Sequence, residues 1–136
     1  MRRFVTVGAI ALTLVLGFAQ TALAGSPHFV YLNKDISGST ATVSGKVAGL
    51  GNETQIHVTA EAEVACLNPG QSFPQATNKQ SVGAAGDFPV QNGKATFNLT
   101  LTAVFQPKCS PPMTLVWGPI TVCVSGATFE TFCQDP

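Results

Sequence analysis

The stretch that decides the fold is residues 55–65, with the sequence QIHVTAEAEVA. Apolar residues occupy every second position and polar residues fill the positions between them. Successive side chains of a strand point to opposite faces, so this alternation places one face on a core and the other in water. The apolar set is Ile56, Val58, Ala60, Ala62 and Val64, and the polar set is His57, Thr59, Glu61 and Glu63.

The same alternation recurs on both sides of this stretch. Asn92 and Gly93 predict a two-residue hairpin turn, because both tolerate positive φ, and Ser125 with Gly126 predicts another turn. About seven short strands separated by turn signals are typical of a sandwich, so we expect an all-β, Ig-like antiparallel β-sandwich. The further strands are expected at residues 28–32, 40–47, 87–91, 94–105, 113–124 and 127–132.

Two features add detail to this architecture. Trp117 is expected to fill the core or to flank a disulfide, and Gly118 with Pro119 predicts a bulge or bend in an edge strand. The strand at residues 94–105 is expected to bury its alternate apolar side chains. These are Phe97, Leu99, Leu101, Ala103 and Phe105.

The N-terminus has the features of a secretory signal peptide. Arg2 and Arg3 precede an apolar run over residues 4–18, and the small residues Ala22 and Ala24 then form a peptidase site. A membrane-spanning helix is the alternative, but the run is short for the roughly 30 Å hydrocarbon core. We therefore predict a cleaved signal peptide at 1–24, a single secreted β-sandwich domain at 25–136, and no membrane anchor after cleavage.

The charge balance excludes some classes of partner. The whole chain has seven basic and seven acidic residues, and its only arginines are Arg2 and Arg3 of the signal peptide. The expected mature domain is therefore slightly acidic and lacks the basic patch that binds nucleic acid or anionic membranes. The partner is expected to be an extracellular protein, a glycan or a small molecule.

The four cysteines are expected to form two disulfides. They are all in the mature chain, and an even count in a short exported domain is typical of disulfide bonding. A zinc site would need a shorter C-x₂₋₄-C spacing. Of the three connectivities, we favour Cys66–Cys109, which would tie two loop regions together, and Cys123–Cys133, which would clip the C-terminal segment.

The longest break in the strand pattern lies between Cys66 and Gly86. It is rich in proline, glycine, amide and hydroxyl residues, so we expect an exposed loop. Loops of this length are uncommon in compact domains and are either functional or loosely ordered. The candidate binding residues in it are Asn68, Pro69, Gln71, Phe73, Asn78 and Lys79.

A second break, residues 106–112, contains Lys108 and Ser110 beside Cys109 and three prolines. A lysine on a loop stiffened by proline and pinned by a disulfide resembles the reactive loop of a serine-protease inhibitor of the Bowman–Birk kind. Such a loop fits a protease cleft with little further loss of entropy. The alternative is a plain turn between two strands.

No catalytic, metal or cofactor motif stands out. Neither His28 nor His57 lies in a nucleophile motif, and His57 is expected to be a solvated strand residue. Glu61 and Glu63 share a strand face with carboxylates about 7 Å apart, which leaves a carbohydrate-active enzyme as a third hypothesis. No calcium loop accompanies them, so we expect no metal and no cofactor.

Two asparagines match the N-glycan acceptor pattern. Asn52 begins the tripeptide NET and Asn98 begins NLT. Asn98 is expected to face outward on its strand, where a eukaryotic host could modify it.

Five phrases of the mature chain resemble a family of small exported bacterial proteins without an assigned function. They are VAGLGN at 47–52, ACLNPG at 65–70, NK at 78–79, FPVQNGK at 88–94 and FQPKCSPPM at 105–113. The resemblance extends to about Val122 and implies export and β-rich character, with no activity to transfer. A looser similarity to the neocarzinostatin-type proteins covers architecture alone, because the cysteine spacing differs.

Taken together, these patterns predict a secreted, extracellular and non-enzymatic protein. We expect it to bind a partner through the loop between Cys66 and Gly86, or to pack into an extracellular layer. The alternative hypothesis is protease inhibition through Lys108, and the third is glycan hydrolysis at Glu61 and Glu63.

Overall fold

The computed structural model describes residues 26–73 and 76–136, so the predicted signal peptide lies outside the described residues. Within them the chain forms strands and no α-helix. In chain order the strands are β1 (His28–Ser37), β2 (Thr40–Ala48), β3 (Gln55–Leu67), β4 (Asn78–Pro89), β5 (Ala95–Thr102), β6 (Thr114–Ser125) and β7 (Phe132–Gln134).

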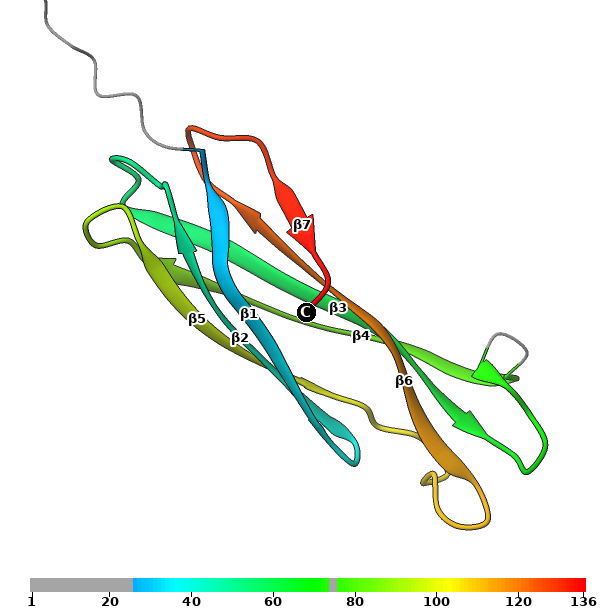
Figure 1. Ribbon diagram of the computed structural model, residues 1–136. Helices are drawn as coiled ribbons and strands as arrows, with labels where there is room; N and C mark the ends of the chain where they lie inside the picture. The colour runs from blue at the N-terminus through cyan, green and yellow to red at the C-terminus, as the bar shows by residue number, and fades with distance from the viewer. Residues whose placement is uncertain (1–25, 74–75) are drawn as a thin grey trace, which may run out of the picture.

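The strands form two antiparallel sheets that pack face to face (Figure 1). One sheet has the order β1-β2-β5 and the other has the order β4-β3-β6-β7. Every strand pair in the described chain is antiparallel. The predicted all-β antiparallel sandwich is therefore confirmed.

The core lies between the two sheets and follows the alternation seen in the sequence. In β3, Val58, Ala60 and Val64 are fully buried, whereas Glu61 and Glu63 between them are exposed. In β5, Leu101 is fully buried. Of the other apolar residues expected inside on that stretch, Phe97, Leu99 and Ala103 are buried and Phe105 is half-buried.

Two predicted local features are confirmed. Asn92 and Gly93 both have positive φ, 52° and 71°, as a two-residue hairpin turn of this kind requires. In the β3–β6 ladder the register shifts by one residue, so that Gly118 and Pro119 of β6 oppose Glu63 alone. This is a β-bulge. It lies where β6 is the edge of its sheet, because β7 pairs with residues 122–124 only.

The expected loop between Cys66 and Gly86 is wrong for roughly its second half. Residues 78–86 belong to β4, which pairs with β3 from Cys66 opposite Asn78 to Gln55 opposite Pro89. Two of the inward positions of this segment hold the small residues Ala84 and Gly86, so its own pattern is weak. Pairing along the whole length of β3 supplies the strand structure instead.

The C-terminal strand also differs from its prediction. The expected strand at 127–132 and the turn at Ser125 and Gly126 are wrong, because β6 runs through Ser125 and β7 begins only at Phe132. Cys133 pairs directly with Cys123 in the β6–β7 ladder. The register that joins these two cysteines sets the place of β7.

Both disulfides have the predicted pairing, Cys66–Cys109 and Cys123–Cys133. Two disulfides in a small domain fit an extracellular protein. Among the described residues, no helix is long and apolar enough to cross a membrane.

Candidate binding site at the disulfide end of the sandwich

One end of the sandwich gathers the turn between β1 and β2, the connection of residues 103–113 and the loop between β3 and β4 (Figure 1). We call it the disulfide end, because the disulfide Cys66–Cys109 lies there. Both segments that the sequence suggested for binding, around Asn68 and around Lys108, belong to this end. The fold therefore brings together two candidates that are far apart in the sequence.

Two hydrogen bonds fix the start of the connection of residues 103–113, one to the β1–β2 turn and one to β4. The backbone amide of Ala103 donates to the carbonyl of Ser39 at 2.8 Å, which ties it to the β1–β2 turn. The amide of Val104 donates to the side-chain oxygen of Gln80 at 3.1 Å, which ties it to β4.

The indole of Trp117 closes the same end from β6. It is half-buried, and its Nε1 donates to the carbonyl of Gly38 at 2.9 Å. Trp117 also packs against the hydrophobic core, as expected. The turn between β1 and β2 is therefore held from two directions, by β6 and by the connection that follows β5.

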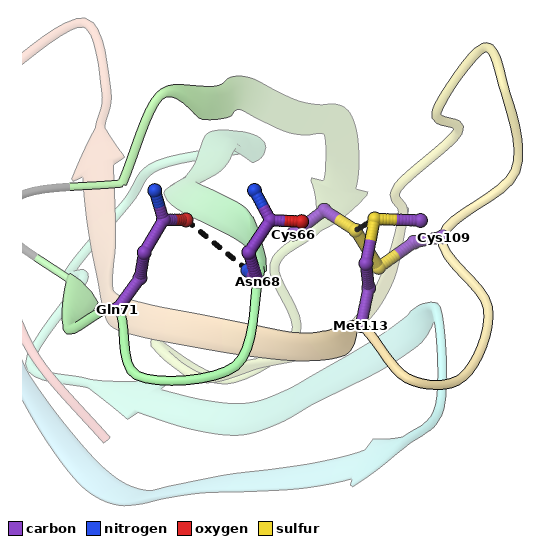
Figure 2. The surroundings of a disulfide bond; sticks show 5 residues. All are labelled: Cys66, Asn68, Gln71, Cys109 and Met113. Atoms are coloured by element: carbon purple, nitrogen blue, oxygen red, sulfur yellow. Dashed lines mark hydrogen bonds between the residues drawn. A yellow bond between two sulfur atoms is a disulfide. The ribbon is translucent and has the colours of Figure 1, made fainter.

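The disulfide Cys66–Cys109 joins the end of β3 to this connection, with a Cα–Cα distance of 5.8 Å. Cys66 is buried, and the sulfur of Met113 lies 3.7 Å from its Sγ (Figure 2). Neither cysteine has an S–H group in the disulfide, so this is a packing contact between sulfur atoms rather than a hydrogen bond. The connection is thus anchored covalently at Cys109 and by packing at Met113.

A cavity of about 450 Å³ opens between the β1–β2 turn and this connection. The lining is mostly apolar, and Lys108 is the one charged residue in it. This size and character are typical of small-molecule sites, which combine an apolar wall with a few polar groups. The lining residues are Gly38, Ser39, Thr102, Ala103, Val104, Phe105, Gln106, Lys108, Cys109 and Leu115.

A second hollow, of about 330 Å³, lies on the other side of residues 104–106. Two of the candidate binding residues, Asn78 and Lys79, line it together with Cys66 and Met113. Asn78 and Lys79 are at the start of β4 rather than in a loop. Lys79 also lies 3.8 Å from the carboxylate of Glu63, an exposed pair that contributes little to stability.

The candidate residues nearest to Cys66 form a turn of their own. The amide of Gln71 donates to the carbonyl of Asn68 at 3.0 Å, and Gly70 has a φ of 85°, so residues 68–71 form a β-turn with Pro69 and Gly70 at its centre. The side-chain oxygen of Gln71 accepts a further bond from the amide of Asn68 at 3.1 Å (Figure 2). This side-chain oxygen is therefore used to hold the turn.

Phe73 serves the packing of the loop. A methyl group added at Gly118 would lie only 2.7 Å from the Phe73 ring, so the ring rests directly on the bulge of β6. A glycine is needed at this position because the ring approaches the backbone so closely. Of the loop candidates, Phe73 therefore holds the loop in place and does not project into solvent.

Lys108 and Ser110, the candidates for protease inhibition, are both exposed. The amide of Met113 donates to the carbonyl of Ser110 at 3.0 Å, which closes a turn after Cys109. Lys108 is at once part of the cavity wall and accessible from solvent. Either role of Lys108, as a ligand contact or as a residue inserted into a protease, is compatible with this placement.

The acidic pair of the third hypothesis lies on the outer face of β3. Glu61 and Glu63 border a shallow hollow whose other lining residues include no aromatic ring. A glycosidase needs a platform for the sugar as well as two carboxylates. Within residues 26–73 and 76–136, no group of three histidine, cysteine or acidic side chains is arranged to hold a metal ion.

Sequence reasoning missed two polar contacts at the opposite end. Nδ1 of His57 lies 2.7 Å from Oδ1 of Asp87, the residue directly opposite it in the β3–β4 ladder. Glu53 is a buried acidic residue whose Oε1 accepts bonds from both the amide and the hydroxyl of Thr128 at 2.6 Å. These bonds, led by that of the hydroxyl, lower the pKa of Glu53 below its usual value of 4.5.

Comparison of the chain with models of known families, with curated proteins and with solved structures found no match. The resemblance to a family of exported bacterial proteins therefore stays a prediction.

Proposed function

We propose that the protein is an exported binding module whose site is the cavity at the disulfide end. The observation that carries the proposal is the mostly apolar cavity of about 450 Å³ with a single lysine in its wall. Its ligand is a small molecule with an apolar body and an anionic group. The apolar body contacts Val104, Phe105 and Leu115, and the anionic group pairs with Lys108.

The anchoring of the cavity supports this proposal. Its walls come from the β1–β2 turn, the connection of residues 103–113 and the start of β6, and these are joined by the hydrogen bonds of Ala103 and Trp117. A site whose walls are fixed before binding loses little conformational entropy when the ligand enters. The predicted export, together with two disulfides that fit an extracellular protein, supports an action of this module outside the cytoplasm.

The test uses an anionic naphthalene sulfonate dye as a probe, followed by fluorescence titration. Val104 is 58% exposed at the rim, so Val104→Asp leaves the core intact and adds a negative charge beside the cavity. Lys108→Met removes the attraction, and because the lysine is exposed we expect a loss of roughly two- to fivefold in affinity. Val104→Asp should weaken binding further, by at least tenfold.

Two matched controls separate the site from the rest of the surface. Val30→Asp makes the same change at another exposed valine, on β1, and Lys94→Met removes a lysine at the opposite end. Both should bind the dye as the parent does. Equal dye binding by the parent and Val104→Asp would show that the cavity is not the site.

The second candidate function is protease inhibition through Lys108. It is supported by the exposure of Lys108 directly before the disulfide-bonded Cys109. Inhibition of a trypsin-like enzyme by the parent, lost in Lys108→Ala and kept in Lys94→Ala, would favour this function over ligand binding. If Lys108→Ala inhibits as well as the parent, the inhibitor hypothesis is excluded.

A further inference from the structure

Three side chains with complementary chemistry form a row across the outer face of the four-stranded sheet. His57 of β3 is opposite Asp87 in the β3–β4 ladder and opposite Ser125 in the β3–β6 ladder. Directly opposite residues of an antiparallel pair have their side chains on one face, with Cβ atoms roughly 4.5–5.5 Å apart. The register therefore places a carboxylate, an imidazole and a hydroxyl side by side in that order.

The bond to Asp87 sets the proton on the imidazole. Nδ1 of His57 lies 2.7 Å from Oδ1 of Asp87, and an ionised carboxylate only accepts hydrogen bonds. In the neutral ring, Nδ1 therefore carries the proton and Nε2 has the free lone pair. Asp87 thus orients a base whose accepting nitrogen is directed away from β4.

The space beside Ser125 is lined by polar and small residues. A hollow of about 360 Å³ is lined by His57, Ser125 and residues from the two adjacent chain segments. The side chain of His57 is 49% exposed, so a group on a larger molecule can reach it. The remaining lining residues are Glu53, Thr54, Gln55, Gly126 and Ala127, which suit a short acyl group better than a long apolar one.

We propose that Ser125, His57 and Asp87 form a hydrolytic site for short-chain esters, a second activity beyond the ligand binding proposed above. Oγ of Ser125 bonds to the ester carbonyl carbon while its proton passes to Nε2 of His57. The bond between the acyl carbon and the alcohol oxygen breaks, and the alcohol leaves with that proton. Water then attacks the acyl-serine and gives its proton to Nε2. The carboxylic acid leaves as Oγ of Ser125 takes the proton back.

The neighbouring amides limit the rate of this site. The amide of Thr128 donates to Oε1 of Glu53, and the amide of Ala127 is directed at the same carboxylate and helps to lower its pKa, so neither is available to an oxyanion. Activation of the serine by its base is then the main source of acceleration, a factor of roughly 10²–10⁴. A covalent probe for activated serines is therefore a more sensitive readout than turnover.

The experiment treats the oxidised, folded protein with a fluorophosphonate and locates the adduct by peptide mass spectrometry. We expect the adduct on Ser125, with labelling roughly 100-fold slower in His57→Gln and at least tenfold slower in Asp87→Asn. Ser81→Ala is the matched control, because Ser81 is an exposed serine on the outer face of the same sheet, opposite Glu63. It should be labelled on Ser125 at the parent's rate.

Labelling of the parent decides the proposal even if a variant fails to fold. An unlabelled Ser125 in the folded parent overturns it, and so does equal labelling of the parent and His57→Gln. The site is roughly 30 Å along β3 from Cys66, at about 3.3 Å per residue. Val104→Asp should therefore leave the labelling unchanged, so that failure of one proposal does not affect the other.

Discussion

Removal of each disulfide in turn provides a quantitative test of the scaffold. The disulfide Cys66–Cys109 spans 43 residues and Cys123–Cys133 spans 10. In the chain-entropy model, a cross-link removes about 2.1 + 1.5R ln n cal/mol/K from the unfolded ensemble. At 25 °C this gives about 4 kcal/mol for the first disulfide and about 2.7 kcal/mol for the second. Replacing both cysteines of a pair by alanine should therefore cost more stability for Cys66–Cys109, by about 1.3 kcal/mol.

Urea unfolding of the parent and the two double variants measures this difference, with linear extrapolation to water. The slope of the unfolding curve should rise in both variants, because an unfolded chain without the cross-link exposes more surface. Cys66 is also buried against Met113, so its truncation adds a packing loss in the same direction. An equal loss in the two variants, or a larger loss for Cys123–Cys133, would refute the reasoning.

Three further predictions concern single residues. The bonds from Thr128 lower the pKa of Glu53 in the folded state. The ionised carboxylate therefore stabilises the fold above pH 4.5, and this stabilisation is lost as the pH falls through the folded-state pKa. Urea midpoints measured between pH 7 and pH 3 should fall less steeply in Glu53→Gln. Gly118→Ala should lower the free energy of unfolding in urea by about 1–3 kcal/mol, because the added Cβ would lie 3.0 Å from a backbone oxygen of β3. Gly83→Ala is the control and should be nearly neutral, because its Cβ would lie 3.4 Å from the nearest atom. Leu101→Ala should cost about 2–5 kcal/mol by the same measurement, because Leu101 is fully buried.

The sequence was informative where structure is set by local pattern. The alternation of β3 predicts its buried face residue by residue, and the turn at Asn92 and Gly93 follows from the φ values that these residues tolerate. β4 was not predictable in this way. Its inward positions include Ala84 and Gly86, which bury little apolar surface, so the strand depends on pairing with β3.

The candidate sites depend on contacts between distant segments. The sequence suggested Lys108 and Asn78 separately, and only the disulfide and the folded connection show that they lie on two sides of residues 104–106. His57 was expected to be a solvated strand residue. Its partners Asp87 and Ser125 are assigned by register, which depends on turns and bulges elsewhere in the sheet.

The bulge at Gly118 and Pro119 accommodates one extra residue in β6, and this affects both the core and the row of side chains at His57. Before the bulge, β6 directs Leu115 and Trp117 inward, and after it Ile120 and its alternate neighbours are inward. If β6 kept all its residues but paired without a bulge, the register before this point would continue and place Val124 opposite His57. A one-residue slip turns every side chain beyond it to the other face. The bulge therefore preserves the buried face of β6 and brings Ser125 to His57.

Deletion of Pro119 should consequently be tolerated. Gly118 alone would then oppose Glu63, and every later residue of β6 would keep its partner and its face. Deletion of Thr121 is the contrast, because no bulge absorbs it and the two fully buried side chains of Val122 and Val124 would turn outward, at about 1.5–3 kcal/mol each. This loss is comparable with much of the stability of a small domain, about 5–15 kcal/mol. Urea unfolding of the two deletion variants should therefore give a midpoint near the parent's without Pro119 and a much lower one without Thr121. The reverse order would show that the register of β6 does not depend on the bulge.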